Sequence, residues 1–200
     1  QTITSCLEFP VKMKTIYIFI IFLLVAVIQI NIPTQMILNQ ESILKTGTTY
    51  KFKTQPVDPS DPFKGKYINL NYEIDSFKTN DSIWERNEPI YVYLSTDSLG
   101  FAKVKTVSRN ILEDNNDDYV KAKAQWYRNY SNDLTIQFPF NRYYMKETKA
   151  YDAEVAVRNR QQDLLPNNTY ALVYVKNGEA VLNDVIIDAV SIKDYVEKVK

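Results

Sequence analysis

The chain has 200 residues with 24 basic and 24 acidic side chains, so its formal net charge is zero. A balance of this kind gives no electrostatic footprint for nucleic acid, and we expect no nucleic-acid partner. Histidine is absent, which excludes Ser-His and Cys-His catalysis and histidine-based zinc sites. The one cysteine, Cys6, cannot form an intramolecular disulfide. We expect no metal and no cofactor.

The amino-terminal residues precede a hydrophobic run. Residues 1–14 are predicted to be a short tail. Met13 and Lys14 open a typical Met-Lys-hydrophobic start, so we interpret residues 1–12 as upstream translation or a fragment edge, not as part of the working protein.

Residues 15–38 are predicted to form one transmembrane anchor helix. At about 1.5 Å per residue this helix is roughly 36 Å long, enough to cross a hydrocarbon core of about 30 Å. A cleaved signal peptide and a buried core helix are the alternatives. Small residues suited to cleavage do not follow the run, which favours an anchor. Lys12 and Lys14 favour a cytoplasmic amino terminus, so we expect a single-pass protein of the cell membrane whose carboxyl-terminal domain lies in the periplasm or at the cell surface.

Residues 41–200 are predicted to form one β-rich domain. The composition includes fifteen tyrosines and only four glycines, and tyrosine suits half-buried strands. Alternation of apolar and polar residues predicts strands over 48–54, 66–74, 90–95, 101–107, 121–130, 134–140, 170–175 and 180–189, the last two joined at Asn177-Gly178. A helical spacing predicts one amphipathic helix over 146–164. The expected fold is mainly antiparallel β, sandwich- or barrel-like, with this short helix and the transmembrane helix.

One segment is specific enough to suggest a family. Residues 65–72 read Gly-Lys-Tyr-Ile-Asn-Leu-Asn-Tyr and follow a Pro- and Asp-rich approach at 56–63. Two further segments lie on either side of it: Ile-Leu-Lys-Thr-Gly at 43–47 comes before, and Arg-Tyr-Tyr-Met-Lys-Glu at 142–147 comes after. The order of these segments is more specific than the eight-residue motif alone. This sequence resembles the GDYXXLXY proteins over nearly the whole chain from Met13, except that Lys66 stands where the family has aspartate. The resemblance implies a membrane-anchored bacterial protein without an assigned activity, encoded beside multi-span membrane proteins.

The motif and its neighbours supply the candidate binding residues. Gly65 permits a tight entry to a strand, and Leu70 and Tyr72 are expected on the face that packs. The opposite face would carry Tyr67, which with Lys66, Asp58 and Asp61 could form a binding surface because exposed aromatics near charges favour interfaces. A second polar cluster would contain Arg142, Tyr143 and Glu147, with Tyr144 beside them.

Catalytic chemistry has little support in the sequence. Ser60 and Lys64 are the best candidates for a catalytic Ser-Lys pair. Nothing in the surrounding sequence indicates the desolvated pocket that would lower the pKa of the lysine. The acidic run at 113–118 lacks the glycine and glutamate that an EF-hand would need at Tyr119 and Gln125, so it is interpreted as a solvated loop.

The leading hypothesis is therefore a non-enzymatic extracytoplasmic module that docks onto an integral membrane partner. The alternative is a small-ligand or cell-envelope binding domain with a Tyr-lined cleft. A hydrolase using Ser-Lys or paired carboxylates is the weakest option. The sequence leaves the partner, the ligand and the oligomeric state open.

Overall fold

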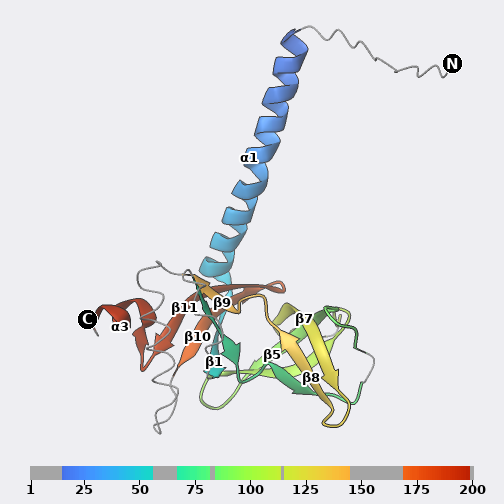
Figure 1. Ribbon diagram of the computed structural model, residues 1–200, viewed down its shortest axis with the longest axis vertical. Helices are drawn as coiled ribbons and strands as arrows, with labels where there is room; N and C mark the ends of the chain where they lie inside the picture. Colours follow the sequence, from blue (N-terminus) through green and yellow to red (C-terminus); the bar gives the residue numbers. More distant parts are fainter. Residues whose placement is uncertain (1–14, 56–66, 82–83, 114, 145–168, 199–200) are drawn as a thin grey trace, which may run out of the picture. The chain divides into compact units, whose positions relative to one another are not determined.

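A computed structural model of the chain describes residues 15–55, 67–81, 84–113, 115–144 and 169–198 (Figure 1). Its residues separate into two compact units, one ending at Glu41 and one beginning at Ser42. The predicted helix over 146–164 lies outside the described residues.

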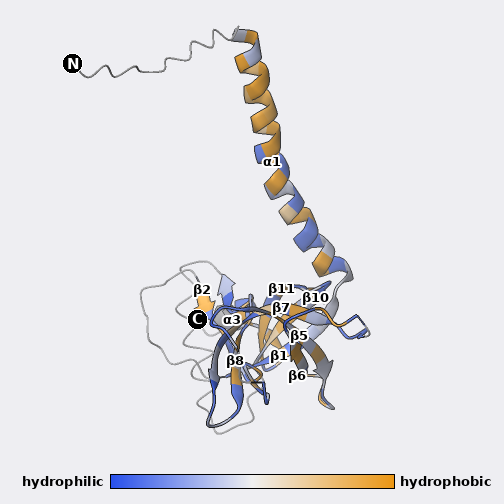
Figure 2. Ribbon diagram, turned by 90° about the vertical axis from the view of Figure 1, so that its right-hand side faces the viewer, coloured by the Kyte–Doolittle hydropathy of each residue, from blue (hydrophilic) through white to orange (hydrophobic). Residues whose placement is uncertain are grey.

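The first unit consists of most of helix α1, Thr15–Thr46, which is assigned as one helix across Pro33. Its amino-terminal part is almost entirely hydrophobic, and polar residues follow toward its end (Figure 2). The helix is long and apolar enough to cross a membrane, a property that a signal sequence shares. It ends where the amide of Gly47 donates to the carbonyl oxygen of Ile43 at 2.8 Å.

The second unit is mainly antiparallel β, as predicted. Strands β1 (Thr48–Gln55), β3 (Asn71–Tyr72), β10 (Tyr170–Lys176), β11 (Glu179–Ile187) and β12 (Val190–Ser191) form one five-stranded sheet in the order β12-β11-β10-β1-β3. Strands β4 (Ser76–Lys78), β5 (Pro89–Thr96), β6 (Ala102–Ser108), β7 (Tyr119–Arg128) and β8 (Asp133–Gln137) form another in the order β4-β8-β7-β5-β6. Strands β2 (Tyr67–Asn69) and β9 (Arg142–Tyr144) make a separate pair, and helix α3 (Ile192–Lys198) follows β12.

Two isolated parallel bridges connect the five-stranded sheets into a nearly closed barrel-like arrangement. Lys51 of β1 bridges to Phe101 beside β6, and Val120 of β7 bridges to Gly178 in the β10–β11 turn. A closed or nearly closed sheet leaves few unpaired strand edges.

The core lies between these sheets and is built around aromatic rings. Phe52 of β1 is fully buried, and its ring centroid lies 5.5 Å from Tyr72, 5.5 Å from Phe138 and 4.8 Å from Phe140. All three contacts are edge-to-face, a geometry that aromatic quadrupoles favour. The alternation of exposed and buried residues along β1 places Tyr50, Phe52 and Thr54 on the inner face, as period-2 geometry requires.

Two local expectations need correction, and three short elements were not expected. The single strand expected over 66–74 is divided, because β2 pairs with β9 whereas β3 pairs with β1. Its inward face is nevertheless as predicted, since Ile68, Leu70 and Tyr72 are all buried. The predicted strand over 134–140 ends at Gln137, and Arg142–Tyr144 forms the separate strand β9. Strands β4 and β12 and helix α3 were not predicted from the sequence, because each is short.

Candidate functional site

The β2–β9 pair places residues 67–69 of the motif opposite residues 142–144. Its register joins Tyr67 to Tyr144, Ile68 to Tyr143 and Asn69 to Arg142. Because side chains alternate across a strand, Ile68 and Tyr143 enter the core, and the other four residues share the opposite face. We call Tyr67, Asn69, Arg142 and Tyr144 the β2–β9 outer face.

Aromatic rings and a cation are in contact on this outer face. The Tyr67 and Tyr144 ring centroids lie 5.5 Å apart, and the guanidinium carbon of Arg142 lies 5.0 Å from the Tyr67 ring centroid. Such a cation–π contact is worth about 0.5–1 kcal/mol at an exposed site. Tyr144 is 65% exposed. The outer face therefore presents an exposed aromatic side chain beside an oriented guanidinium.

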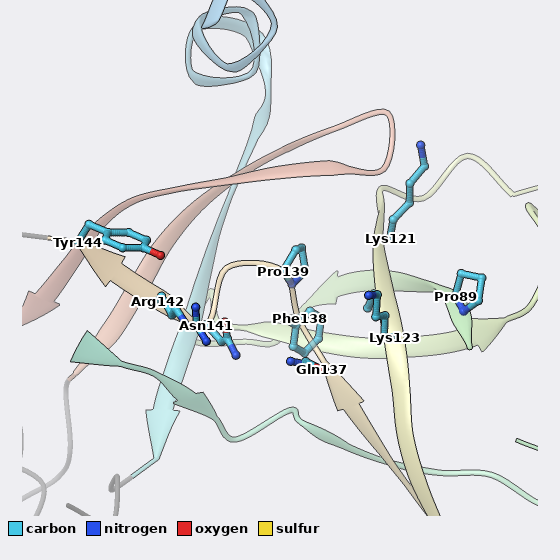
Figure 3. Close-up of a pocket in the computed structure, with 10 residues that line it drawn as sticks. Pro89, Lys121, Lys123, Gln137, Phe138, Pro139, Asn141, Arg142 and Tyr144 are labelled. Carbon is cyan, nitrogen blue, oxygen red and sulfur yellow. The ribbon is translucent and has the colours of Figure 1, made fainter. Parts of the chain in front are cut away.

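A hollow of about 580 Å³ adjoins the outer face (Figure 3). We call it the basic hollow, because every charged residue in its lining is a cation, namely Lys121, Lys123 or Arg142. Figure 3 shows the Tyr144 hydroxyl directed toward the other lining residues. The rest of the lining is polar or apolar without charge: Pro89, Ala122, Gln137, Phe138, Pro139, Asn141 and Tyr144.

Two conspicuous tyrosines have structural roles instead. Tyr72 is 1% exposed and its hydroxyl donates to the carbonyl oxygen of Phe140 at 2.7 Å. Tyr143 donates to the Asp184 carboxylate at 2.9 Å. Burial is the main cause that raises the pKa of both phenols well above the usual range, and Asp184 adds to the effect at Tyr143. Neither hydroxyl is available to a ligand. Because Leu70, Tyr72 and Tyr143 are all buried, they belong to the core and not to the candidate site.

A half-buried carboxylate, that of Asp75, lies just after the motif. Asp75 accepts a hydrogen bond from the amide of Tyr72 at 2.9 Å. Burial raises the pKa of Asp75 to about 6, against the lowering effect of that hydrogen bond. This carboxyl stabilises a turn and is not part of the lining of the basic hollow.

Two acids of the run at 113–118, Asp117 and Asp118, bind neighbouring side chains of the domain. Asp118 accepts from the Tyr50 hydroxyl at 3.1 Å, and Asp117 pairs with Lys105 at 2.6 Å. Among the described residues, no group of three or more metal-ligating side chains is found.

Several predicted site residues lie outside the described residues. These are Asp58, Asp61, Gly65, Lys66 and Glu147, together with the Ser60 and Lys64 pair. Of the predicted residues that are described, the structure brings Tyr67 and Arg142 together.

The lysines of the hollow were missed by the sequence reasoning. Lys121 and Lys123 alternate with Val120, Ala122 and Ala124 along β7, so their exposed position follows from the strand period. That signal was present in the sequence. Their proximity to Arg142 was not, since it depends on how β7 and β9 are placed.

Comparison with known protein families identifies a match over most of the chain. A family model described as GDYXXLXY protein matches residues 29–185, which is most of the chain. No curated protein and no solved structure matches the sequence. The match includes the divided motif strand, the outer face and the basic hollow, and the chain belongs to the GDYXXLXY family.

Proposed function

We propose that this protein is a non-enzymatic, membrane-anchored module whose extracytoplasmic β domain docks onto an integral membrane protein through the β2–β9 outer face. The observation that carries the proposal is the contact of Tyr67 with both Arg142 and Tyr144 on an exposed surface. Tyrosine and arginine are enriched at protein interfaces and dominate their binding energy.

The outer face is suited to docking because its side chains are held in place before a partner arrives. Tyr67 and Tyr144 stand on paired strands, and their rings are in contact. Arg142 lies over the Tyr67 ring, which limits its rotamers. Side chains fixed in this way lose less conformational entropy on binding, so more of the contact energy contributes to affinity.

The apolar helix supports a partner in the same membrane. Residues 15–38 are uncharged, and an uncleaved helix of this length keeps the attached domain beside the bilayer. Tethering raises the effective concentration of membrane partners, so a modest interface is sufficient. Lys14, directly before the helix, favours placing the domain outside the cytoplasm.

The location is tested first by fractionation and protease treatment. We expect the full chain to stay in the membrane pellet after alkaline washing, and the domain to be digested by protease added to intact spheroplasts. A chain recovered in the soluble fraction, or a domain protected in spheroplasts, would contradict the anchored extracytoplasmic arrangement.

Docking is tested by photo-crosslinking in intact cells. A photoreactive phenylalanine analogue replaces Tyr144, and in a matched control it replaces Tyr130, which is 86% exposed in the β7–β8 turn. We expect one integral membrane protein to be crosslinked repeatedly from position 144 and not from position 130. Adding Arg142→Glu should reduce that product about tenfold, as expected for loss of about 1.4 kcal/mol. Equal products from both positions would refute docking through this face.

The ligand-binding alternative has one observation in its favour, the basic hollow. Its lining contains one tyrosine and three cations, which suits an anionic ligand better than a sugar stacked between aromatic rings.

A further inference from the structure

The basic hollow differs from three other places on the domain where a cation is paired with a carboxylate. Lys53 pairs with Glu73 at 2.8 Å, and Lys105 pairs with Asp117 at 2.6 Å. Arg109 is held by Asp81 and Glu88 and lies 4.0 Å from the Trp84 ring centroid. These sites are neutralised from within the fold.

The cations of the hollow have no such neutralisation. In the part of the chain that the structure describes, Lys121, Lys123 and Arg142 form no ion pair with a carboxylate, although the whole sequence has as many acids as bases. Gathering like charges around one hollow is unfavourable unless something of opposite sign occupies it. The arrangement therefore has the electrostatics of an anion site.

The uncharged part of the lining completes such a site. Gln137 and Asn141 bring amide groups that can donate hydrogen bonds, and Tyr144 brings a hydroxyl that points inward (Figure 3). Pro89, Phe138 and Pro139 add apolar surface to the same lining. The volume of about 580 Å³ lies within the range of small-ligand sites.

The cations stand on elements that the fold holds firmly. Lys121 and Lys123 belong to β7, which is paired on one side with β5 and on the other with β8. Lys121 occupies the rim, where its amide donates to the carbonyl oxygen of Gly178 at 2.9 Å. Arg142 is oriented by the Tyr67 ring. Charges placed by paired strands bind a compact ligand better than charges on free loops.

We propose that the basic hollow binds a compact polyanion bearing phosphate groups, with the Arg142 guanidinium as the directional contact and Lys121 and Lys123 as charge partners. A guanidinium offers a planar fork that matches two phosphate oxygens, and lysine ammonium groups act as point charges beside it. Phosphate groups of this kind occur on free small molecules and on lipid headgroups. The site does not depend on the docking proposal.

Binding is tested with the full chain in an uncharged detergent, using sodium pyrophosphate as the probe in isothermal titration calorimetry. We expect saturable binding that weakens as salt is raised, because screening reduces the attraction. The paired substitution Lys121→Gln with Lys123→Gln should weaken binding at least about tenfold. The control pair Lys78→Gln with Lys103→Gln removes the same charge from exposed positions on β4 and β6 and should leave affinity unchanged.

A further variant separates charge from geometry. Arg142→Lys keeps the positive charge but loses the fork, so we expect weaker binding than in the unmodified chain at the same salt. Thermal melts of each variant establish that the domain is folded before affinities are compared. Equal weakening by the Lys121/Lys123 pair and the control pair, or no saturable binding by the unmodified chain, would overturn the proposal.

Lysine footprinting distinguishes the two sources of phosphate. The chain is placed in nanodiscs and treated with an amine-acetylating reagent, and the modification of Lys123 is read by mass spectrometry. Protection by pyrophosphate in phosphatidylcholine nanodiscs supports a soluble ligand. Protection without pyrophosphate, seen only in nanodiscs that contain phosphatidic acid, supports a lipid headgroup. Absence of protection in every arm overturns the proposal, even if Tyr144 still crosslinks to a membrane protein.

Discussion

The amide of Lys121 donates a hydrogen bond to the carbonyl oxygen of Gly178 at 2.9 Å, which joins the β10–β11 turn to β7. This hydrogen bond belongs to the parallel bridge between Val120 and Gly178, which connects the two five-stranded sheets. One tight turn thus helps to close the barrel-like arrangement, and it also fixes the end of the strand that carries the lysines of the basic hollow.

Gly178→Ala should destabilise the domain by about 1–3 kcal/mol, the usual range for a strained backbone with a close contact. Gly178 has a φ of +82°, and a Cβ there would stand 2.4 Å from Cε2 of Tyr119. The control is Gly100→Ala, where φ is +80° and a Cβ would meet nothing within 4 Å. Chemical denaturation should show the larger loss at Gly178. An equal loss at both glycines would mean that backbone strain alone matters.

Tyr143→Phe should lower the free energy of unfolding by about 1–3 kcal/mol, because it leaves the half-buried Asp184 carboxylate without its phenol donor. Tyr144→Phe removes the same hydroxyl from the adjacent residue, which is 65% exposed, and should change stability by less than about 0.5 kcal/mol. Urea denaturation of both variants measures the difference. Similar values for the two would contradict the assignment of Tyr143 to the core.

Asp75→Asn should change how stability depends on pH. Burial raises the pKa of Asp75 from 3.8 to about 6 in the folded state, so the folded protein holds this proton more tightly than the unfolded chain does. The resulting stabilisation is fully present below pH 3.8 and is lost as pH rises through about 6. Asparagine retains an oxygen for the Tyr72 amide without a charge to bury.

The measurement for Asp75 is the difference in unfolding free energy between variant and unmodified domain. We expect Asp75→Asn to gain relative stability between about pH 4 and pH 7, by on the order of 1 kcal/mol after allowance for partial exposure. A difference that is constant over this range would show that Asp75 does not titrate with a raised pKa.

Phe52→Ala should cost about 3–5 kcal/mol, since it removes a fully buried ring from the centre of the aromatic core. Phe101→Ala serves as a comparison, because Phe101 is half-buried and contacts one ring, that of Tyr170, at 5.8 Å. Its cost should be clearly smaller. A thermal melt checks both, and a near-equal loss would mean that the core is not centred on Phe52.

Local sequence patterns determined most of the regular elements. The apolar run predicted a helix, and alternation predicted β1, β5, β6, β7, β10 and β11 because side chains of a strand point alternately to two faces. Asn177-Gly178 predicted the tight hairpin, and both residues have positive φ as that turn requires. The same alternation placed Leu70 and Tyr72 in the core and Tyr67 opposite them.

Only the tertiary structure decided which strands pair and which side chains meet. Period-2 alternation assigns a residue to a face without naming the partner strand, so the sequence could not show that the motif strand divides between β9 and β1. Lys123 and Arg142 come from separate strands, and they border one hollow because long-range packing places β7 and β9 around it. The sequence by itself thus determined faces and turns, which are local, whereas the outer face and the basic hollow required contacts between distant segments.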